Sequence, residues 1–247
     1  MKYAYLSDKG QVRKTNQDYV GIFKNDSNSI LTIVADGVGG NRGGDVASEM
    51  AVSHIGYLFE TSDVNNVKDA KDWLVRQLAL ENHKILQASK HYKNLNGMGT
   101  TIVLALFLGG KVVVANLGDS RCYLFNPQIG LKQLSTDHSL VNELLKMGKI
   151  TPEEAQNHPD KNVITKTLGI SDQAEAEIKV FDVHENDEIL LCTDGLTNFV
   201  SDEMIKNVLL STVELEQKVS QLVEMANQGG GYDNITTLIV QMETGAD

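Results

Sequence analysis

Short apolar runs of strand length recur towards both ends of the chain, and stretches with helical spacing separate them. Such runs predict strands at residues 4–6, 19–23, 30–35, 101–108, 112–117, 122–125, 189–192 and 235–240. They come in pairs and triplets, without the regular strand–helix alternation that is typical of a parallel sheet. The pattern therefore predicts mainly antiparallel sheets that are covered by helices.

The stretches between these runs carry apolar residues at helical spacing. Apolar stripes predict helices over residues 47–59, 73–86, 140–147 and 213–226. A further helix is expected to begin at Thr151, which can cap it, with Pro152 at its first position and Glu154 completing a capping box.

Length and composition fit one folded domain. The chain has 247 residues, 41% of them hydrophobic, and this content with mixed charge argues against intrinsic disorder. A sandwich of about 250 residues commonly forms one unit, and no repeat or flexible linker divides the chain, so we expect a single domain over residues 1–247. Residues 157–173 are polar and poorly periodic, which predicts a loop that acts as a surface flap.

Charge and targeting signals restrict the expected partners and location. The formal net charge of -11 disfavours nucleic acid and an anionic membrane surface as partners. The chain begins without a secretory signal pattern, and no apolar run approaches the roughly 20 residues that cross a bilayer. Cys122 and Cys192 lie inside apolar runs and are expected to be unpaired core residues. These features favour a cytoplasmic protein.

Four aspartates stand at the ends of predicted strands. Asp36, Asp119 and Asp194 each end an apolar run, and Asp233 comes immediately before the last one. Strand ends bring distant parts of a chain together, and the glycine that follows Asp36 or Asp194 lets backbone or ligand approach closely. The alternative is turn formation, because Asp-Gly is a common turn dipeptide, and for any one position alone the turn is favoured.

If these carboxylates converge, a cation must neutralise them, because carboxylates within a few ångströms of each other cannot all stay ionised unaided. Oxygen-only ligands favour a hard divalent ion such as Mg²⁺ or Mn²⁺ over Zn²⁺, which prefers histidine and cysteine. None of the six histidines falls in an HExxH or HxH arrangement, and the EF-hand spacing is missing. The pattern therefore predicts a Mg²⁺ or Mn²⁺ site.

Six short motifs occur in the order Arg13-x-x-Asn16-x-Asp18, Ala35-Asp36-Gly37-Val38-Gly39-Gly40, Gly97-Met98-Gly99-Thr100-Thr101, Gly118-Asp119-Ser120-Arg121, Thr193-Asp194-Gly195-Leu196 and Gly231-x-Asp233-Asn234-Ile235-Thr236. Together they resemble the bacterial branch of the metal-dependent serine/threonine protein phosphatases, the type 2C (PPM) family, over residues 8–240. The resemblance implies an α+β fold, a four-layer α-β-β-α sandwich of two antiparallel sheets flanked by helices.

The resemblance also implies two Mn²⁺ or Mg²⁺ ions, with a third ion at a separate position. Asp36 would bridge the two ions, and the carbonyl group of Gly37 would bind the second of them. Asp194 and Asp233 would hold the first ion.

Three further positions take roles from the resemblance. Asp18 would reach metal through water, and Asp119 together with Asp194 resembles the third-ion site of bacterial members. Arg13 would bind the substrate phosphate, since a guanidinium presents a fixed fork of donors to phosphate oxygens. A surface residue or an ion pair in a turn is the alternative for this arginine.

These roles predict hydrolysis of phosphoserine and phosphothreonine in proteins. Two ions about 3.5–4 Å apart lower the pKa of a bridging water, so that metal-bridging hydroxide exists near neutral pH and attacks phosphorus in line. The ions and Arg13 offset the charge of the phosphoryl oxygens. The resemblance further implies a bacterial signalling enzyme whose partners are phosphorylated proteins and a cognate eukaryotic-type Ser/Thr kinase that it opposes.

The chain departs from the family pattern at two positions. Bacterial relatives usually read Asp-Gly-Met-Gly-Gly-His, and here Val38 and Asn41 replace the methionine and the histidine. That histidine is a candidate for protonating the leaving group, and Asn41 cannot exchange a proton near neutral pH. Water or another residue would then supply the proton, or turnover would be slower. His138 is assigned to a helix start and not to the site.

Other phosphatase chemistries lack their motifs in this chain. No C-x₅-R begins at Cys122 or Cys192, Asp194 lacks the second acid of a D-x-D-x-[TV] motif, and no P-loop sequence occurs. A non-catalytic phosphoprotein-binding domain of the same fold is the alternative from another class. Loss of a metal ligand would support it, and all the ligands are present.

Overall fold

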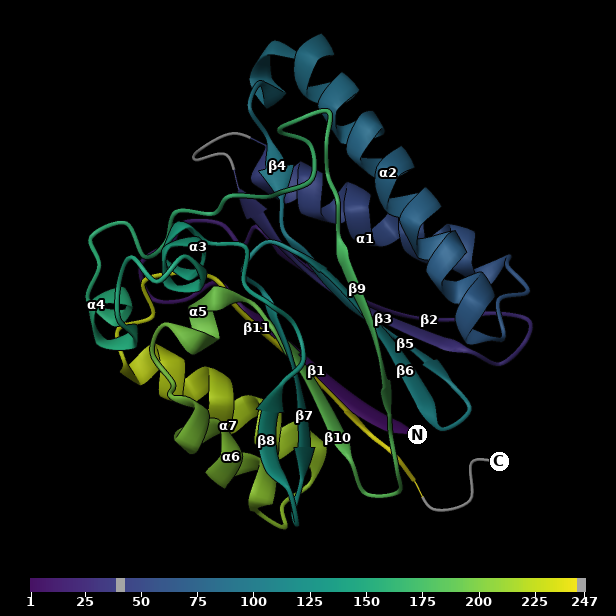
Figure 1. Cartoon of the computed structure of the whole chain (residues 1–247), viewed down its shortest axis with the longest axis vertical. Helices are drawn as coiled ribbons and strands as arrows, with labels where there is room; N and C mark the ends of the chain where they lie inside the picture. The colour runs from purple at the N-terminus through teal and green to yellow at the C-terminus, as the bar shows by residue number, and fades with distance from the viewer. Residues whose placement is uncertain (39–42, 244–247) are drawn as a thin grey trace.

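The computed structural model describes residues 1–38 and 43–243, and its framework is two antiparallel sheets packed face to face (Figure 1). The five-stranded sheet has the order β1 (Lys2–Asp8), β11 (Ile235–Gln241), β10 (Glu188–Cys192), β7 (Arg121–Asn126) and β8 (Gly130–Gln133). The six-stranded sheet has the order β2 (Asp18–Lys24), β3 (Ile30–Val38), β5 (Ile102–Leu108), β6 (Lys111–Leu117) and β9 (Glu177–Asp182), with β4 (Gly99–Thr100) paired to β3.

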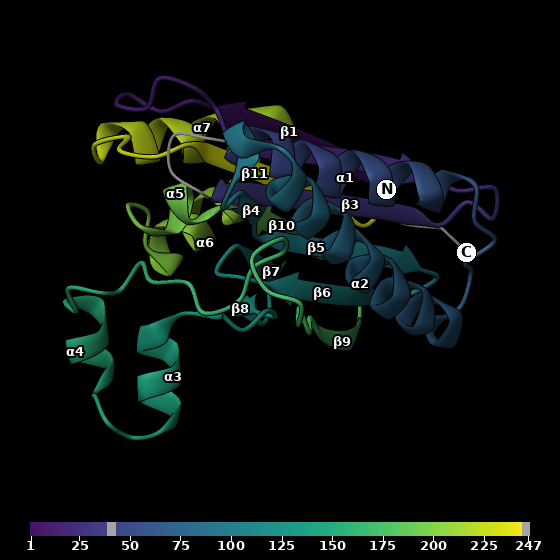
Figure 2. The same ribbon diagram turned by 90° about the horizontal axis from the view of Figure 1, so that it is seen from above.

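Helices cover both outer faces of the sheet pair (Figure 1, Figure 2). The six-stranded sheet carries α1 (Gly44–Glu60) and α2 (Val67–His91), which is followed by the 3-10 turn η1 (Lys93–Leu95). The five-stranded sheet carries α5 (Asp194–Thr197), α6 (Asp202–Leu210) and α7 (Leu215–Gln228). The short helices α3 (Leu140–Lys146) and α4 (Pro152–Gln156) project away from the sheets, as Figure 2 shows. The predicted four-layer α-β-β-α sandwich is confirmed.

Three apolar clusters fill the spaces between the layers. Successive residues of a central strand serve different clusters, so that Ile33 packs under α1 and α2 whereas Val34 faces the other sheet. On β5, Leu104 likewise packs in the cluster under the helices, whereas Val103 faces the other sheet. Because both faces of these strands are buried, their sequences are continuously apolar rather than alternating with polar residues.

The predicted elements are present in the structure. All eight predicted strands are found, and the predicted capping box at Thr151 forms with Glu154. Both cysteines are buried and unpaired, as expected from their apolar surroundings. No helix within the described residues combines the length and the apolar composition needed to cross a membrane.

Residues 157–173 form an irregular segment that is tied down at its second half. Leu168 is fully buried and forms a β-bridge with Thr100. The side chain of Asn82 accepts a hydrogen bond from the backbone N–H of Gly169 at 2.7 Å and donates to the carbonyl group of Ser171 at 2.9 Å. The predicted loop is therefore anchored on α2, and its role as a flap stays a prediction.

Candidate metal centre

Five aspartates from separate elements lie at one end of the sandwich. Asp18 begins β2 and is the register partner of Asp36 near the end of β3. Asp119 follows β6, Asp194 begins α5 directly after β10, and Asp233 precedes β11. Because neighbouring strands are antiparallel, the ends of β3, β6 and β10 meet the starts of β2 and β11. The structure thus brings the four strand-end aspartates together and adds Asp18 to them.

Two glycines allow the chain segments of this end to approach each other. A Cβ atom at Gly37 would collide with the carbonyl oxygen of Gly44, at the start of α1. A Cβ atom at Gly195 would collide with the carbonyl oxygen of Asn234, in the loop before β11. Only glycine avoids both contacts, so these two positions set β3 against α1 and α5 against the loop before β11.

Two threonine side chains hold the backbone of Asp36. Its N–H donates to Oγ1 of Thr101 at 3.0 Å, and its carbonyl oxygen accepts from Oγ1 of Thr100 at 2.9 Å. Oγ1 of Thr101 also lies 2.7 Å from Oγ of Ser120, the residue that follows Asp119. The Thr-Thr pair after Gly99 therefore positions Asp36 and connects it to the segment that carries Asp119.

Burial and mutual repulsion raise the pKa values of four of these aspartates. Burial is the main cause at Asp18, whose pKa is raised to about 7, and hydrogen bonds from two threonines oppose the shift. Burial and then the charge of Asp194 raise the pKa of Asp119 to about 8. The pKa values of Asp36 and Asp194 are raised first by burial and then by the charges of Asp18 and Asp233, respectively. The ionised cluster therefore carries uncompensated negative charge.

Three buried carboxylate oxygens of this cluster, Oδ1 of Asp18, Asp119 and Asp194, have no hydrogen-bond partner in the described part of the chain. An unpaired buried carboxylate is destabilising, and a cation would offset its charge. Within residues 1–38 and 43–243, no three acids, histidines or cysteines are grouped as a metal cage. A hard ion such as Mg²⁺ binds carboxylate oxygens and keeps several waters, so the residues present fit such an ion without forming a closed cage.

Arg13 lies beside the cluster in an ion pair. Its Nη2 donates to Oδ2 of Asp233 at 2.7 Å, and its Nε donates to the carbonyl oxygen of Tyr232 at 3.2 Å. The side chain remains 49% exposed. Arg13 therefore makes the ion pair that the alternative interpretation expected, and it does so at the edge of the acidic cluster.

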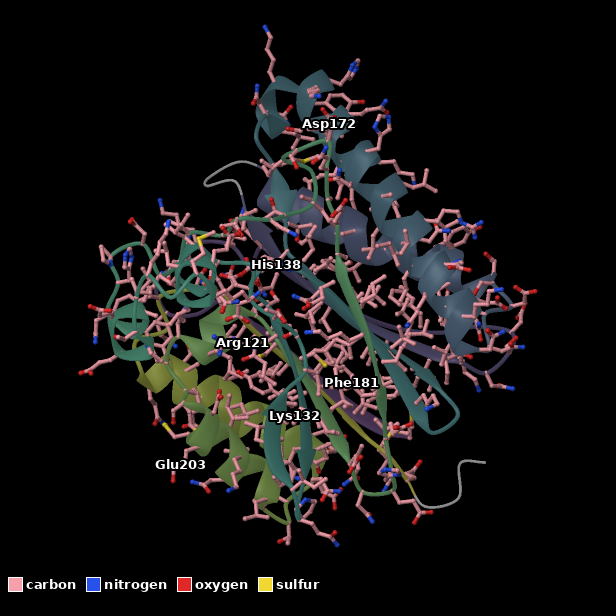
Figure 3. All side chains as sticks on the ribbon, viewed as in Figure 1. Arg121, Lys132, His138, Asp172, Phe181 and Glu203 are labelled. Carbon is pink, nitrogen blue, oxygen red and sulfur yellow. The ribbon has the colours of Figure 1, made fainter. Side chains whose placement is uncertain are left out.

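The other arginine of the motifs, Arg121, is engaged with a different acid. Its guanidinium donates to both carboxylate oxygens of Asp137 at 2.7–3.1 Å and to the hydroxyl group of Tyr123 at 3.0 Å. Figure 3 shows Arg121 within the side chains that surround α5 and β7. The arginine of this motif therefore pairs with Asp137 rather than with the acidic cluster.

His138 directly precedes Ser139, the residue that caps α3, as its assignment to a helix start predicted (Figure 3). Its Nδ1 accepts a hydrogen bond from the N–H of Gly118, next to Asp119, at 3.2 Å. Burial and then the charge of Lys166 lower the pKa of His138, which keeps the ring neutral and able to accept this bond. Asn41, the predicted departure from the family pattern, lies outside the described residues.

Two asparagines at the site have roles that the sequence did not predict, although Asn234 belongs to one of the six motifs. Asn198 donates to Oδ2 of Asp194 at 2.9 Å, and the spacing of four residues within one helical turn was a signal for this contact. Asn234 makes hydrogen bonds of 2.8–2.9 Å with the backbone of residues 9–17. It thereby ties the loop that carries Arg13 to the start of β11.

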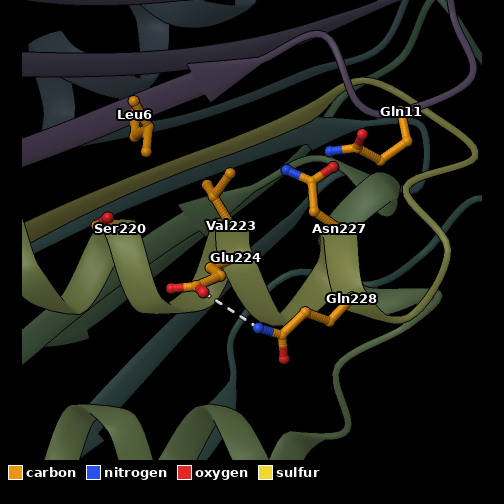
Figure 4. Close-up of a pocket in the computed structure, with 7 residues that line it drawn as sticks. All are labelled: Leu6, Gln11, Ser220, Val223, Glu224, Asn227 and Gln228. Atoms are coloured by element: carbon orange, nitrogen blue, oxygen red, sulfur yellow. Dashed lines mark hydrogen bonds between the residues drawn. The ribbon is translucent and has the colours of Figure 1, made fainter.

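A cavity of about 450 Å³ lies between β1 and α7 (Figure 4). Leu6 and Gln11 line it on one side, and Val223 and Asn227 of α7 line it on the other. Its lining includes none of the residues predicted for the site. The cavity and the candidate metal centre are therefore separate features of the molecule.

The family model described as protein phosphatase 2C matches residues 9–237 of the chain. The serine/threonine phosphatase Stp of Listeria monocytogenes is 41% identical over 244 residues, which are 98% of this chain and 96% of that protein. The chain therefore belongs to the protein phosphatase 2C family and is a serine/threonine protein phosphatase.

Solved structures agree with this fold. The serine/threonine phosphatase of S. agalactiae superposes with a TM-score of 0.94 at 38% identity, covering 98% of this chain and 99% of that one. The catalytic domain of the phosphatase PstP, solved in complex with two manganese ions, has a TM-score of 0.85 at 32% identity and covers 97% of each chain. The expected family and fold are both confirmed.

Proposed function

We propose that this phosphatase hydrolyses phosphoserine and phosphothreonine in proteins at the acidic end of the sandwich, with divalent metal ions bound there. The observation that carries the proposal is the set of buried carboxylate oxygens on Asp18, Asp119 and Asp194, which lack hydrogen-bond partners within the described residues. Buried charge of this kind is retained where a cation binds. Arg13 at the edge of the cluster adds a donor for an anionic substrate.

In the proposed site, Asp36 holds two ions, the carbonyl group of Gly37 contributes to the second, and Asp194 and Asp233 hold the first. Bound divalent ions lower the pKa of a coordinated water and offset the charge of phosphoryl oxygens. The chain's own contribution is orientation. The hydrogen bond from Asn198 fixes Oδ2 of Asp194 and leaves Oδ1 for metal.

Asp119 is proposed to contribute, with Asp194, to a third ion, and Asp18 to hold a water that reaches metal. Arg13 is proposed to bind the substrate phosphate from the loop that Asn234 ties to β11. A phosphate monoester that approaches this end would meet the guanidinium at the rim and the metal ligands below it.

Mn²⁺ and Mg²⁺ are the proposed ions, and their removal tests the function. Purified protein is expected to release phosphate from a phosphothreonine peptide with Mn²⁺ and to lose this activity completely in excess EDTA. Adding back Mn²⁺ beyond the chelator should restore the rate. A folded protein that releases no phosphate with Mn²⁺ or Mg²⁺ would favour the phosphoprotein-binding alternative.

Replacing Arg13 by alanine is expected to raise the KM for a phosphothreonine peptide by about 10- to 100-fold, because hydrogen bonds to charged groups contribute about 1.5–3 kcal/mol. The value of kcat should change less, because the metal ligands remain. Steady-state kinetics at saturating Mn²⁺ measures both constants and removes any effect on metal affinity. Arg76→Ala, on the exposed face of α2, is the matched control. An unchanged KM in Arg13→Ala would remove this arginine from the substrate site.

We also propose a cellular setting for this activity. The enzyme would act in the cytoplasm on phosphorylated proteins and oppose a bacterial Ser/Thr kinase that shares its substrates. Residues 1–247 would work as one catalytic domain, which is supported by a family match that covers residues 9–237 and by a site that draws on both sheets.

A further inference from the structure

Hydrogen bonds from the opposite sheet hold the side chain of Asp18. This aspartate belongs to the six-stranded sheet, whereas Thr236 lies in β11 and Thr193 follows β10, both in the five-stranded sheet. Both threonine hydroxyls donate to the same oxygen, Oδ2, at 2.7 Å from Thr236 and 2.9 Å from Thr193. Both threonines are fully buried, and Asp18 is 6% exposed. These contacts join the two sheets at the acidic end.

The hydrogen bonds continue from Thr236 towards the loop that carries Arg13. Ser7, the register partner of Thr236 on β1, has its Oγ 2.7 Å from Oγ1 of that threonine. Nδ2 of Asn16 donates to Oγ of Ser7 at 2.8 Å, while Oδ1 of the same asparagine accepts from the backbone N–H of Asp18 at 3.2 Å. The contacts therefore form a closed circuit, which runs from the Asp18 side chain through Thr236, Ser7 and Asn16 and returns to the backbone of Asp18.

Counting protons gives this circuit one direction. A hydroxyl group has a single proton, so Thr236, which donates to Asp18, must accept from Ser7. Ser7 accepts in turn from the amide group of Asn16, whose nitrogen can only donate. The donors of these three successive hydrogen bonds all point along the circuit towards Oδ2 of Asp18. Hydrogen bonds aligned in this way strengthen one another in a buried site. Oδ1 of Asp18 is left without a partner among the described residues.

We propose that Asn16, Ser7, Thr236 and Thr193 are positioning residues that hold Asp18 as an oriented carboxylate and so set the metal affinity of the site. The inference deepens the proposed function and rests on its metal site. Saturation of Oδ2 by two hydroxyl donors fixes the rotation of the carboxylate and directs Oδ1 away from these donors. Partners that orient a metal site in this way typically change metal affinity by about 10- to 100-fold when they are removed.

The test compares two identical substitutions at neighbouring positions of β11. Thr236→Val removes the hydroxyl group that donates to Asp18. Thr237→Val removes a buried hydroxyl group that has no hydrogen-bond partner within the described residues. Titration calorimetry with Mn²⁺ on the full chain is expected to show an affinity about 10-fold lower for Thr236→Val and unchanged for Thr237→Val. Thr236→Ser, which restores the hydroxyl group, should recover most of the lost affinity.

A graded result is expected along the circuit. Ser7→Ala removes the bonds of Ser7 to Thr236 and Asn16 but leaves Thr236 able to donate to Asp18, so its effect should be smaller than that of Thr236→Val. Because Ser7 is only half-buried, this variant also keeps the test possible if Thr236→Val does not fold. Equal Mn²⁺ affinity in the wild type, Ser7→Ala and any folded Thr236→Val would overturn the proposal. Failure of Thr236→Ser to recover affinity would do the same, because it would implicate the methyl group.

The outcome separates this inference from the proposed function. A wild-type chain that binds no Mn²⁺ contradicts the metal site itself, and with it the inference. A wild-type chain that binds Mn²⁺ and is active, while the hydroxyl substitutions leave affinity unchanged, contradicts the inference alone.

Discussion

Replacing Asp194 by asparagine is expected to reduce kcat/KM by more than about 100-fold, because the loss of a residue that merely supports a metal ligand already costs about 10- to 100-fold. Asp194 is the first residue of α5, and its carboxylate interacts with the charge of Asp233. In addition to burial, its charge raises the pKa values of the other three aspartates of the cluster, so it lies among them. The amide keeps the shape of the side chain and an oxygen for the contact with Asn198. Loss of activity can therefore be attributed to the missing charge rather than to altered packing.

The same substitution should raise the thermal stability of the metal-free protein. Burial and the charge of Asp233 raise the pKa of Asp194, so neutralising this carboxyl group removes an unfavourable charge. Phosphate release at saturating Mn²⁺ and melting in EDTA measure the two effects on one sample. Asp182→Asn, an exposed aspartate at the end of β9, is a control with the same change in charge and should leave activity unchanged. Near-normal turnover in a folded Asp194→Asn protein would contradict the metal assignment.

The aspartates could be identified from sequence because they interrupt strongly apolar strands. Residues 30–35 and 189–192 are buried on both faces, so the polar residue that ends each run stands out. Whether these aspartates meet could not be predicted from the local sequence, because it depends on the pairing of distant strands. For example, β10 ends at Cys192 and pairs with β11, which begins 43 residues later at Ile235. β9 escaped prediction although Ile178 and Val180 alternate with polar residues, because this alternation is short and most of the strand is only half-buried.

The hydrogen-bond circuit around Asp18 could not be predicted in the same way. The motif that ends at Thr236 gives this threonine no role, and the two neighbouring threonines have the same side chain. The pleat of β11 gives them different surroundings, because successive side chains point to opposite faces of a strand. One hydroxyl group reaches Asp18, and the other finds no partner in the described part of the chain.

The metal-free protein is expected to lose stability as pH rises from 5 to 8. The pKa of Asp18 is raised to about 7 and that of Asp119 to about 8, so the folded state retains protons that the unfolded state has already lost above about pH 4. Where the folded state binds more protons, the free energy of unfolding falls with increasing pH. A net loss of only about 1 kcal/mol would lower Tm by about 2–4 °C in a chain of this size.

Groups outside the cluster contribute with different signs. Glu188, whose pKa is also raised by burial, acts in the same direction as the cluster, but it lies outside it and is paired with Lys218. The exposed acids with lowered pKa values, such as Glu154 and Asp182, finish titrating below the window. His138, whose pKa is lowered by burial, acts in the opposite direction, because the unfolded state takes up its proton first as pH falls. Asp119→Asn should therefore flatten the decline, whereas Asp182→Asn should not.

Divalent metal is expected to reverse the trend, because its ligands must be deprotonated to bind it. Saturating Mn²⁺ should raise Tm more at pH 8 than at pH 5, where the cluster is still protonated. Calorimetry in EDTA and in Mn²⁺ across this range gives both profiles from the same protein. A stability that stays level or increases up to pH 8 in EDTA would contradict the electrostatic account of the site. The acidic end would then be an ordinary set of turns, which is the alternative that each Asp-Gly pair offers when it is considered alone.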